Sequence, residues 1–143
     1  MEKIDLNLLA KSNPTQTIRE HTDELLTRAV VLKDIYNIDE HEYYLLTKAC
    51  EYHDYGKFNS EFQNRIQKKY KFDANKEIPH ALLSLYFINK DEFDNEDYEI
   101  ICYAIAYHHN MHENMINSSY IYSAKLDKLQ NTHKSCNKLR ARV

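Results

Sequence analysis

The chain has 143 residues, which suits one domain with a core of its own and leaves little room for a second. A single glycine and two prolines disfavour an all-β fold, because such folds use these residues in many tight turns, and they favour long helices instead. The net charge of −3 neither favours nor excludes nucleic acid as a partner, so any attraction to phosphate must be local.

The cysteine content indicates the compartment. Cys50, Cys102 and Cys136 are odd in number and widely spaced, which favours reduced thiols over a disulfide framework. Cys50 and Cys102 lie in apolar helical patterns and are expected to pack in the core. The sequence shows neither a signal-peptide pattern nor the roughly 20 consecutive apolar residues of a membrane span. We therefore expect a cytoplasmic protein that has no membrane partner.

The first half of the chain predicts two helices. A short apolar start ends near Pro14, because proline disfavours helix in the residue before it. A long helix is expected from about residue 15 to residue 37. Asp39 is expected to cap the next helix, with Glu42 as its capping-box partner. Gly56 is the natural C-terminal stop of that second helix.

The middle of the chain predicts two shorter helices separated by a loop. Ser60 and Gln63 have the spacing of a capping box, which opens a helix that extends to about residue 70. Residues 71–77 are polar and predict a loop. Pro79 suits the first turn of the helix that follows, because proline is preorganised for that position.

The last part of the chain predicts two more helices. Residues 91–99 contain six acids and no bases, which suits a solvated loop and the N-terminus of a helix. A strongly apolar helix follows and ends at His108 and His109. A final helix is expected over about residues 119–138.

The histidines suggest a metal site. The helical spacing puts five of the eight histidines where an apolar stripe begins or ends: His21, His53, His80, His108 and His109. Asp54 follows His53 directly. An ionised aspartate and several imidazoles beside a core are costly unless something pairs with them, and borderline divalent metals suit this donor set. Each histidine taken singly is better interpreted as an ordinary core or surface residue. Only the joint pattern predicts metal.

The remaining histidines lack this relation to an apolar stripe. They are expected at the surface, and they are His41, His112 and His133.

Four sequence segments carry a family resemblance. Residues 51–63 read Glu-Tyr-His-Asp-Tyr-Gly-Lys-Phe-Asn-Ser-Glu-Phe-Gln and resemble the signature of the HD-superfamily metal-dependent phosphohydrolases. More narrowly, the chain resembles the HD nuclease domain of the type I CRISPR-associated helicase-nuclease. That domain shows an HDxGK core, a Phe-Gln segment, a Pro-His helix start and an Ala-Ile-x-x-His-His motif. These occur here at residues 53–57, 62–63, 79–80 and 104–109, and His21 matches the upstream histidine of the family.

The resemblance implies a compact all-α HD-domain bundle of about six or seven helices. It implies a single HD-type nuclease domain over residues 1–143, with the motifs in about residues 18–110. A basic C-terminal helix or tail follows in about residues 119–143. Asn110 stands where the family usually places glycine, and asparagine tolerates the left-handed backbone of such a turn.

The resemblance also implies a two-metal centre. Asp54 bridges two ions, His21 and His53 hold one of them, and three histidines hold the other: His80, His108 and His109. The family carries a further metal-binding aspartate downstream. Asp127 is the candidate, because it is the only acid after Glu113, although its neighbourhood does not closely match the family. Two such ions activate a bridging water and clamp the attacking and leaving oxygens.

The implied catalytic residues are Asp54, His53 and Lys57. Lys57 either neutralises a phosphate or is a solvated lysine near a helix end. The nitrogen-rich donor set favours Mn, Fe, Co or Ni over Mg, since Mg prefers oxygen ligands.

The implied substrate is single-stranded DNA, delivered by a helicase subunit after a guide-RNA surveillance complex opens the target. Residues 125–143 carry six bases and one acid, a net charge of +5, which suits either phosphate contact or a solvated helix face. Tyr52, Tyr55 and Tyr107 adjoin the motifs and either stack on unpaired bases or pack in the core. Two alternatives stay open: an HD phosphohydrolase of nucleotides, and a catalytically inactive HD-like module that binds a helicase or surveillance complex.

Overall fold

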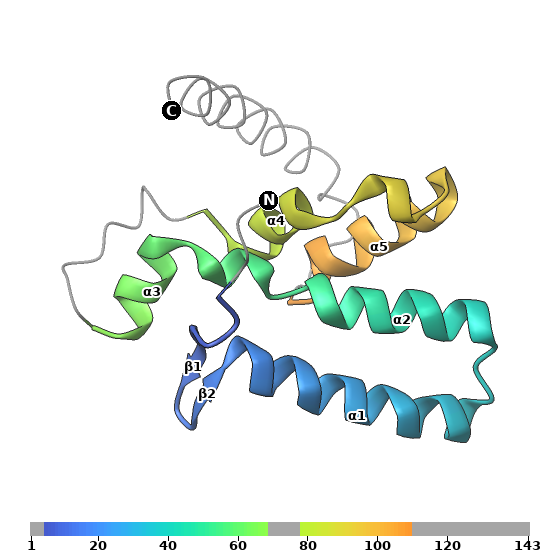
Figure 1. Cartoon of the computed structure of the whole chain (residues 1–143), viewed down its shortest axis with the longest axis horizontal. Helices are drawn as coiled ribbons and strands as arrows, with labels where there is room; N and C mark the ends of the chain where they lie inside the picture. Colours follow the sequence, from blue (N-terminus) through green and yellow to red (C-terminus); the bar gives the residue numbers. More distant parts are fainter. Residues whose placement is uncertain (1–4, 69–77, 110–143) are drawn as a thin grey trace. The chain divides into compact units, whose positions relative to one another are not determined.

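The fold is known from a computed structural model that describes residues 5–68 and 78–109 (Figure 1). Within these ranges the chain forms one two-stranded sheet, five α-helices and three 3₁₀ helices, which confirms the all-α class with a small hairpin added. The elements in chain order are β1 (Leu9–Ser12), β2 (Thr15–Thr17), α1 (Ile18–Tyr36), α2 (Glu40–Tyr52), η1 (Tyr55–Phe58), α3 (Ser60–Ile66), α4 (His80–Ser84), η2 (Leu85–Phe87), η3 (Lys90–Glu92) and α5 (Asn95–Tyr107).

Several predictions concern residues outside the described ranges. They are the loop over residues 71–77, Asn110, His112, Asp127, His133, Cys136, the helix over residues 119–138 and the basic C-terminal stretch.

The N-terminal hairpin corrects the predicted start of the first helix. Thr15–Thr17 is a strand paired antiparallel with β1, so the helix begins at Ile18 and not near Thr15. Thr17 caps α1: its hydroxyl accepts from the Glu20 N–H at 3.1 Å, and the Glu20 carboxylate accepts from the Thr17 N–H at 2.7 Å. This reciprocal capping box fixes where the helix can start. The sequence holds the signal in Thr17 and Glu20, but the prediction did not use it.

The residues just before the hairpin anchor the first turn of α1. The Ile18 N–H donates to the Leu8 carbonyl at 2.8 Å, and the Arg19 N–H donates to the Leu6 carbonyl at 2.9 Å. These bonds satisfy two of the N–H groups that a helix N-terminus otherwise leaves free. The first turn, which leads to His21, is thereby held to the residues that precede the sheet.

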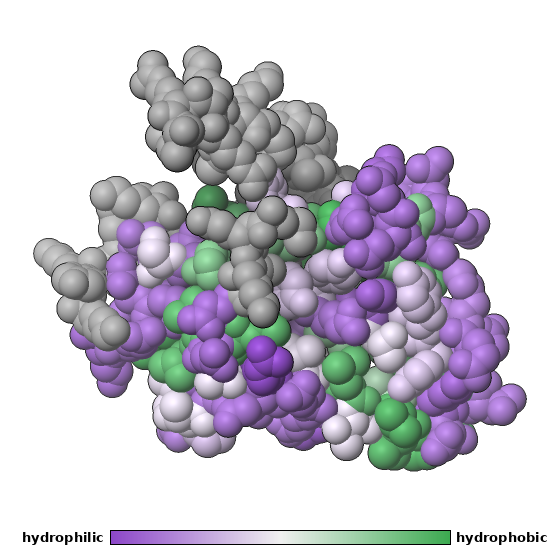
Figure 2. Space-filling model, in the orientation of Figure 1, coloured by the Kyte–Doolittle hydropathy of each residue, from purple (hydrophilic) through white to green (hydrophobic). Residues whose placement is uncertain are grey.

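Helices α1 and α2 run side by side and in opposite directions (Figure 1). Asn37 ends α1 in the left-handed conformation with φ of 50°, and Asp39 caps α2 by accepting from the Glu42 N–H at 2.8 Å. Both ends agree with the sequence-based boundaries. Several apolar side chains are exposed at the surface over the C-terminal half of α1 (Figure 2), where Leu32 and Ile35 are 40% and 67% exposed.

The core lies between α2 and α5. Its buried cluster is Leu45, Tyr52, Ile88, Ile101 and Ile105. Cys102 packs against this cluster, and burial raises the pKa of its thiol, in agreement with an inert core cysteine. Cys50 is half-buried, and its thiol pKa is raised by burial as well.

Gly56 has a different role from the predicted one. Helix α2 ends at Tyr52 with His53 in right-handed geometry, and Gly56 lies beyond it in η1. A Cβ atom at Gly56 would lie 2.0 Å from the His80 carbonyl oxygen and 2.8 Å from the Ser84 nitrogen. The glycine is therefore needed because the backbone of α4 packs directly on it, and not because it ends a helix.

Helix α3 begins with a different cap from the predicted one. Asn59 caps it by accepting from the Glu61 N–H at 2.7 Å and the Phe62 N–H at 3.4 Å, and the helix ends at Ile66. Asparagine is at least as good a cap as serine, and it occurs one residue earlier. Gln63 is consequently no capping partner. It is buried, and its amide NH₂ donates to the Leu9 and Lys57 carbonyls, each at 2.8 Å.

Helices α4 and α5, the last two in the described part of the chain, occur in the predicted order. Pro79 directly precedes α4, and the helix expected after it continues as the 3₁₀ helix η2. Asp94 caps α5 by accepting from the Asp97 N–H at 2.9 Å, so the acidic run does supply a helix N-terminus. Helix α5 ends at Tyr107, and His108 is its C-cap. Within the described part of the chain, no helix is both long and apolar enough to cross a membrane.

Replacing Gly56 with alanine is expected to lower the free energy of unfolding by about 3 kcal/mol or more, because the added methyl group meets backbone that cannot rotate away. Urea unfolding measures the loss. Ser60→Ala is the matched control, since Ser60 is exposed and caps nothing, and it should change stability by less than about 0.5 kcal/mol. A Gly56→Ala protein as stable as this control would contradict the packing described here.

Candidate metal centre

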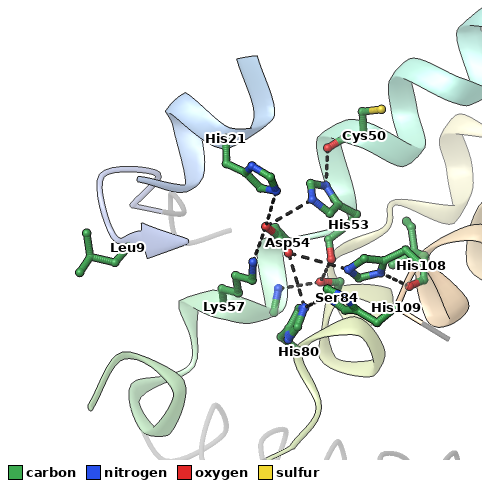
Figure 3. Close-up of polar contacts among 12 residues, drawn as sticks. Leu9, His21, Cys50, His53, Asp54, Lys57, His80, Ser84, His108 and His109 are labelled. Carbon is green, nitrogen blue, oxygen red and sulfur yellow. Dashed lines mark hydrogen bonds and ion pairs between the residues drawn. The ribbon is translucent and has the colours of Figure 1, made fainter. Parts of the chain in front are cut away.

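Five histidines and one aspartate converge from separate elements of the fold (Figure 3). The structure brings together every predicted metal-site residue that it describes. His21 comes from the first turns of α1, His53 and Asp54 follow α2, and His80 opens α4. His108 and His109 follow α5. Each of these positions is at or near a helix end. The apolar faces of the helices pack in the core, and the polar side chains at their ends meet in one cluster.

Asp54 is the centre of this cluster and is 0% exposed. Its Oδ2 lies 3.3 Å from His53 Nε2 and 3.5 Å from His21 Nε2. Its Oδ1 lies 3.6 Å from His80 Nε2 and 4.0 Å from His108 Nε2. The two carboxylate oxygens therefore face two different groups of imidazoles.

These groups define two ligand sets. The first ligand set is His21, His53 and Asp54, and the second ligand set is His80, His108 and His109. Within each set, one donor atom per residue lies within 4.8 Å of the others. Three such donors are the number that proteins commonly supply to a catalytic zinc or similar ion, with an open position left for water or substrate.

Backbone hydrogen bonds orient two of the imidazoles. His53 Nδ1 lies 2.7 Å from the Cys50 carbonyl oxygen, and His108 Nδ1 lies 2.6 Å from the Ile105 carbonyl oxygen. A carbonyl oxygen only accepts, so in each neutral ring Nδ1 carries the proton and Nε2 keeps its lone pair. Both lone pairs point toward Asp54. This is the usual arrangement by which a backbone carbonyl fixes the tautomer of a metal-binding histidine.

Burial keeps the second ligand set neutral. It lowers the pKa of His80 to about 3 and that of His108 to about 4, and it lowers the pKa of His109 and His21 as well. For Asp54, burial alone would raise the pKa. The contacts that His53 and Lys57 make with the carboxylate outweigh the effect of burial and hold the pKa well below its ordinary value. At neutral pH Asp54 is therefore ionised, while His21 and the second ligand set are neutral, which are the protonation states that bind metal.

The donor set fits a divalent cation. Asp54 Oδ1 and His108 Nε2 are buried, lie 4.0 Å apart, and have no hydrogen-bond partner among residues 5–68 and 78–109. Buried polar atoms are nearly always paired, because an unpaired one costs free energy. The Nε2 atoms of His80 and His109 lie 2.8 Å apart, so at least one of them must give its lone pair to a proton or a cation. A cation in each ligand set would satisfy these atoms.

Lys57 lies inside the cluster and is only 8% exposed, which excludes the solvated lysine considered above. Its Nζ donates to Asp54 Oδ2 at 2.7 Å and lies 5.8 Å from the centre of the Phe62 ring. The same Phe62 ring contacts His80 edge-on at 5.6 Å between centroids. The Phe-Gln segment thus supports both Lys57 and a member of the second ligand set.

Residues 18–136 match the family model of the HD domain. The chain belongs to the HD-domain family. The match covers most of the chain, and HD domains are metal-dependent phosphohydrolases, which agrees with the His/Asp clusters found here. No curated protein and no solved structure matched the chain. Asp127, the predicted late ligand, falls within the matched range of the HD domain but outside the described residues.

Other predicted residues of this HD domain lie apart from the centre. His41 is at the surface, as expected, and lies 3.0 Å from Asp97. Tyr52 and Tyr55 pack in or against the core, with their ring centroids 5.3 Å apart, so packing is the correct alternative for both. Tyr107 contacts the ring of Tyr103 at 4.6 Å.

Sequence reasoning missed Ser84 and did not assign a role to Phe62 or Gln63. Ser84 is 0% exposed and touches the backbone of the His53–Gly56 turn. A single serine in an apolar helical segment carries no local signal of such a role. The family resemblance identified Phe62 and Gln63 as part of a motif but did not indicate which residues they contact.

The metal-free protein is expected to lose stability as pH falls from about 6.5 toward 4. His80 and His108 stay neutral in the folded state down to a pKa of about 3 and about 4, whereas an unfolded histidine takes up its proton near 6.5. The unfolded state then binds more protons, so the stabilisation is complete above pH 6.5 and decreases below it. Each imidazole contributes at most about 1.4 kcal/mol per pH unit.

Urea unfolding across this pH window measures the slope. His80→Gln should make the slope shallower. His41→Gln, which changes an exposed histidine outside the centre, should leave it unchanged. A wild-type stability that stays constant from pH 6.5 to pH 4 would show that the imidazoles are not held neutral.

Proposed function

We propose that this HD domain is a metal-dependent nuclease that cleaves single-stranded DNA in CRISPR interference. The observation that carries the proposal is the Asp54 carboxylate, whose two oxygens face two separate groups of imidazoles. Two-metal phosphodiesterases hold their ions roughly 3.5–4 Å apart, and a carboxylate with one oxygen toward each ligand set is suited to bridge such a pair. The narrower choice of a nuclease is supported by the four motifs at residues 53–57, 62–63, 79–80 and 104–109.

The residues divide between two cation sites. His21, His53 and Asp54 would hold one ion, with Asp127 as the further ligand from the C-terminal part of the HD-domain match. The second ligand set would hold the other ion. When bound, such ions act as Lewis acids, lower the pKa of water and stabilise charge on the attacking and leaving oxygens. Because imidazole nitrogens outnumber carboxylate oxygens, we expect Mn, Fe, Co or Ni rather than Mg.

Lys57 is suited to bind the scissile phosphate. Its ammonium group lies 2.7 Å from Asp54 Oδ2, so it is already held at the oxygen that the first ligand set would use. An ion at that oxygen would repel the ammonium group and free its protons for another acceptor. A phosphate oxygen beside the centre is the acceptor that this position favours. His53 and Asp54 would act through the ions, and Lys57 would act on the substrate directly.

The proposed partners follow from the same motifs. In the family that the chain resembles, a helicase subunit feeds single-stranded DNA to the HD domain after a guide-RNA surveillance complex opens the target. The six bases in residues 125–143 would add phosphate contacts along that strand.

The metal-free protein, supplied separately with Mn, Ni, Co or Mg, is expected to cut circular single-stranded DNA with the transition metals and poorly with Mg. Asp54→Ala should fall below about 1% of wild-type activity, because losing an outer-shell partner alone costs 10–100-fold and Asp54 contacts both ligand sets. Cleavage of a circle also identifies endonuclease action. His41→Ala is the matched control and should keep full activity, since His41 lies at the surface.

The same assay separates the alternatives. Release of phosphate from mononucleotides without DNA cleavage would identify a nucleotide phosphohydrolase. A folded, metal-loaded protein that attacks neither substrate would contradict the enzymatic proposal and favour an inactive module that binds a helicase or surveillance complex.

A further inference from the structure

Ser84 lies between the two ligand sets and is 0% exposed (Figure 3). It is the last residue of α4, one turn after His80. Its hydroxyl donates to the His53 carbonyl oxygen at 2.7 Å and accepts from the Gly56 N–H at 2.8 Å. Both hydrogen-bonding functions of the hydroxyl are therefore used, and both are used by the backbone of the turn that carries Asp54.

The two hydrogen bonds are made to residues on either side of Asp54 in the sequence. One is made to the residue before it and the other to the second residue after it, so they hold the backbone that sets the direction of the carboxylate. The donor of the second ligand set on the same helix is His80, whose Nε2 lies 3.6 Å from Asp54 Oδ1. Ser84 thus connects an element of each ligand set through a single hydroxyl group.

The turn and α4 are in direct backbone contact beside Ser84. A methyl group at Gly56 would lie 2.0 Å from the His80 carbonyl oxygen and 2.8 Å from the Ser84 nitrogen. If the hydroxyl is removed, the His53 carbonyl and the Gly56 N–H lose their buried partner, and the turn can shift relative to α4.

We propose that Ser84 is a positioning residue of the metal centre: it holds His80 at the distance from Asp54 that lets the second ligand set share a cation with that carboxylate. The proposal rests on the metal centre of the proposed function, but not on the choice of substrate. Outer-shell groups of this kind commonly set metal affinity through the ligands they orient.

The test is metal affinity in the full chain, measured by titrating the metal-free protein with Co²⁺ and following heat and the visible absorption of bound cobalt. His80→Ala identifies the binding step that belongs to the second ligand set. Ser84→Ala is expected to weaken that same step about 10- to 100-fold and to change its cobalt spectrum. The other step should stay within about threefold of the wild type.

Two further variants separate positioning from a general loss of stability. Ile101→Val removes one methylene from the core cluster on α5 and should leave both steps unchanged. Ser84→Cys keeps a side chain of nearly the same size but bonds weakly. It should also weaken the His80 step, and it serves as the test if Ser84→Ala does not fold.

Two results would overturn the proposal. One is a folded Ser84→Ala or Ser84→Cys protein that binds at both steps like the wild type. The other is an equal loss at both steps that Ile101→Val reproduces, because this would show only general loosening. Failure of the nuclease assay leaves the titration unaffected, whereas a wild-type protein that binds no Co²⁺ would contradict the metal centre itself along with this role of Ser84.

Discussion

The structure of this HD domain depends on one buried charge. Asp54 is fully enclosed, yet its pKa is held well below the ordinary value, so the carboxylate stays ionised. Lys57 compensates Oδ2 at 2.7 Å, while Oδ1 has no hydrogen-bond partner within the part of the chain that the structure describes. A buried, incompletely paired carboxylate lowers stability unless a cation joins it. Metal binding would explain this arrangement, because the atoms that lower stability in the metal-free protein are the atoms that would bind metal.

The rest of the described fold serves to hold this cluster. The donors lie in or next to four helices that are far apart along the chain, so the distances between the donor atoms are set by contacts between these elements. Ser84 and Gly56 join α4 to the turn after α2, and Gln63 joins η1 to β1. The segment that leads into β1 in turn holds the first turn of α1, which leads to His21. Each connection uses a buried hydrogen bond or a direct backbone contact, which positions ligands more rigidly than apolar packing alone.

Local signals in the sequence predicted much of this molecule, and long-range contacts account for what it did not predict. Asp39 was identified as a helix cap because a cap and its N–H partner are three residues apart, and the acidic run that contains Asp94 was identified with a helix start because negative charge is favoured there. The histidines were grouped because helical periodicity relates each to an apolar stripe. The roles of Gly56, Gln63 and Ser84 could not be assigned in this way, because each has a partner 24 to 54 residues away that only the folded chain brings close.

The most direct test of the account is the anomalous scattering of crystals grown from metal-free protein and soaked in Mn²⁺. If Asp54 bridges two cations as proposed, two anomalous peaks roughly 3.5–4 Å apart are expected, one beside each oxygen of its carboxylate. His21 and His53 should contact one peak, and the second ligand set should contact the other. Peaks that leave Asp54 without a contact, or a single ion bound by only one set at saturating Mn²⁺, would contradict the claim that this carboxylate bridges two cations.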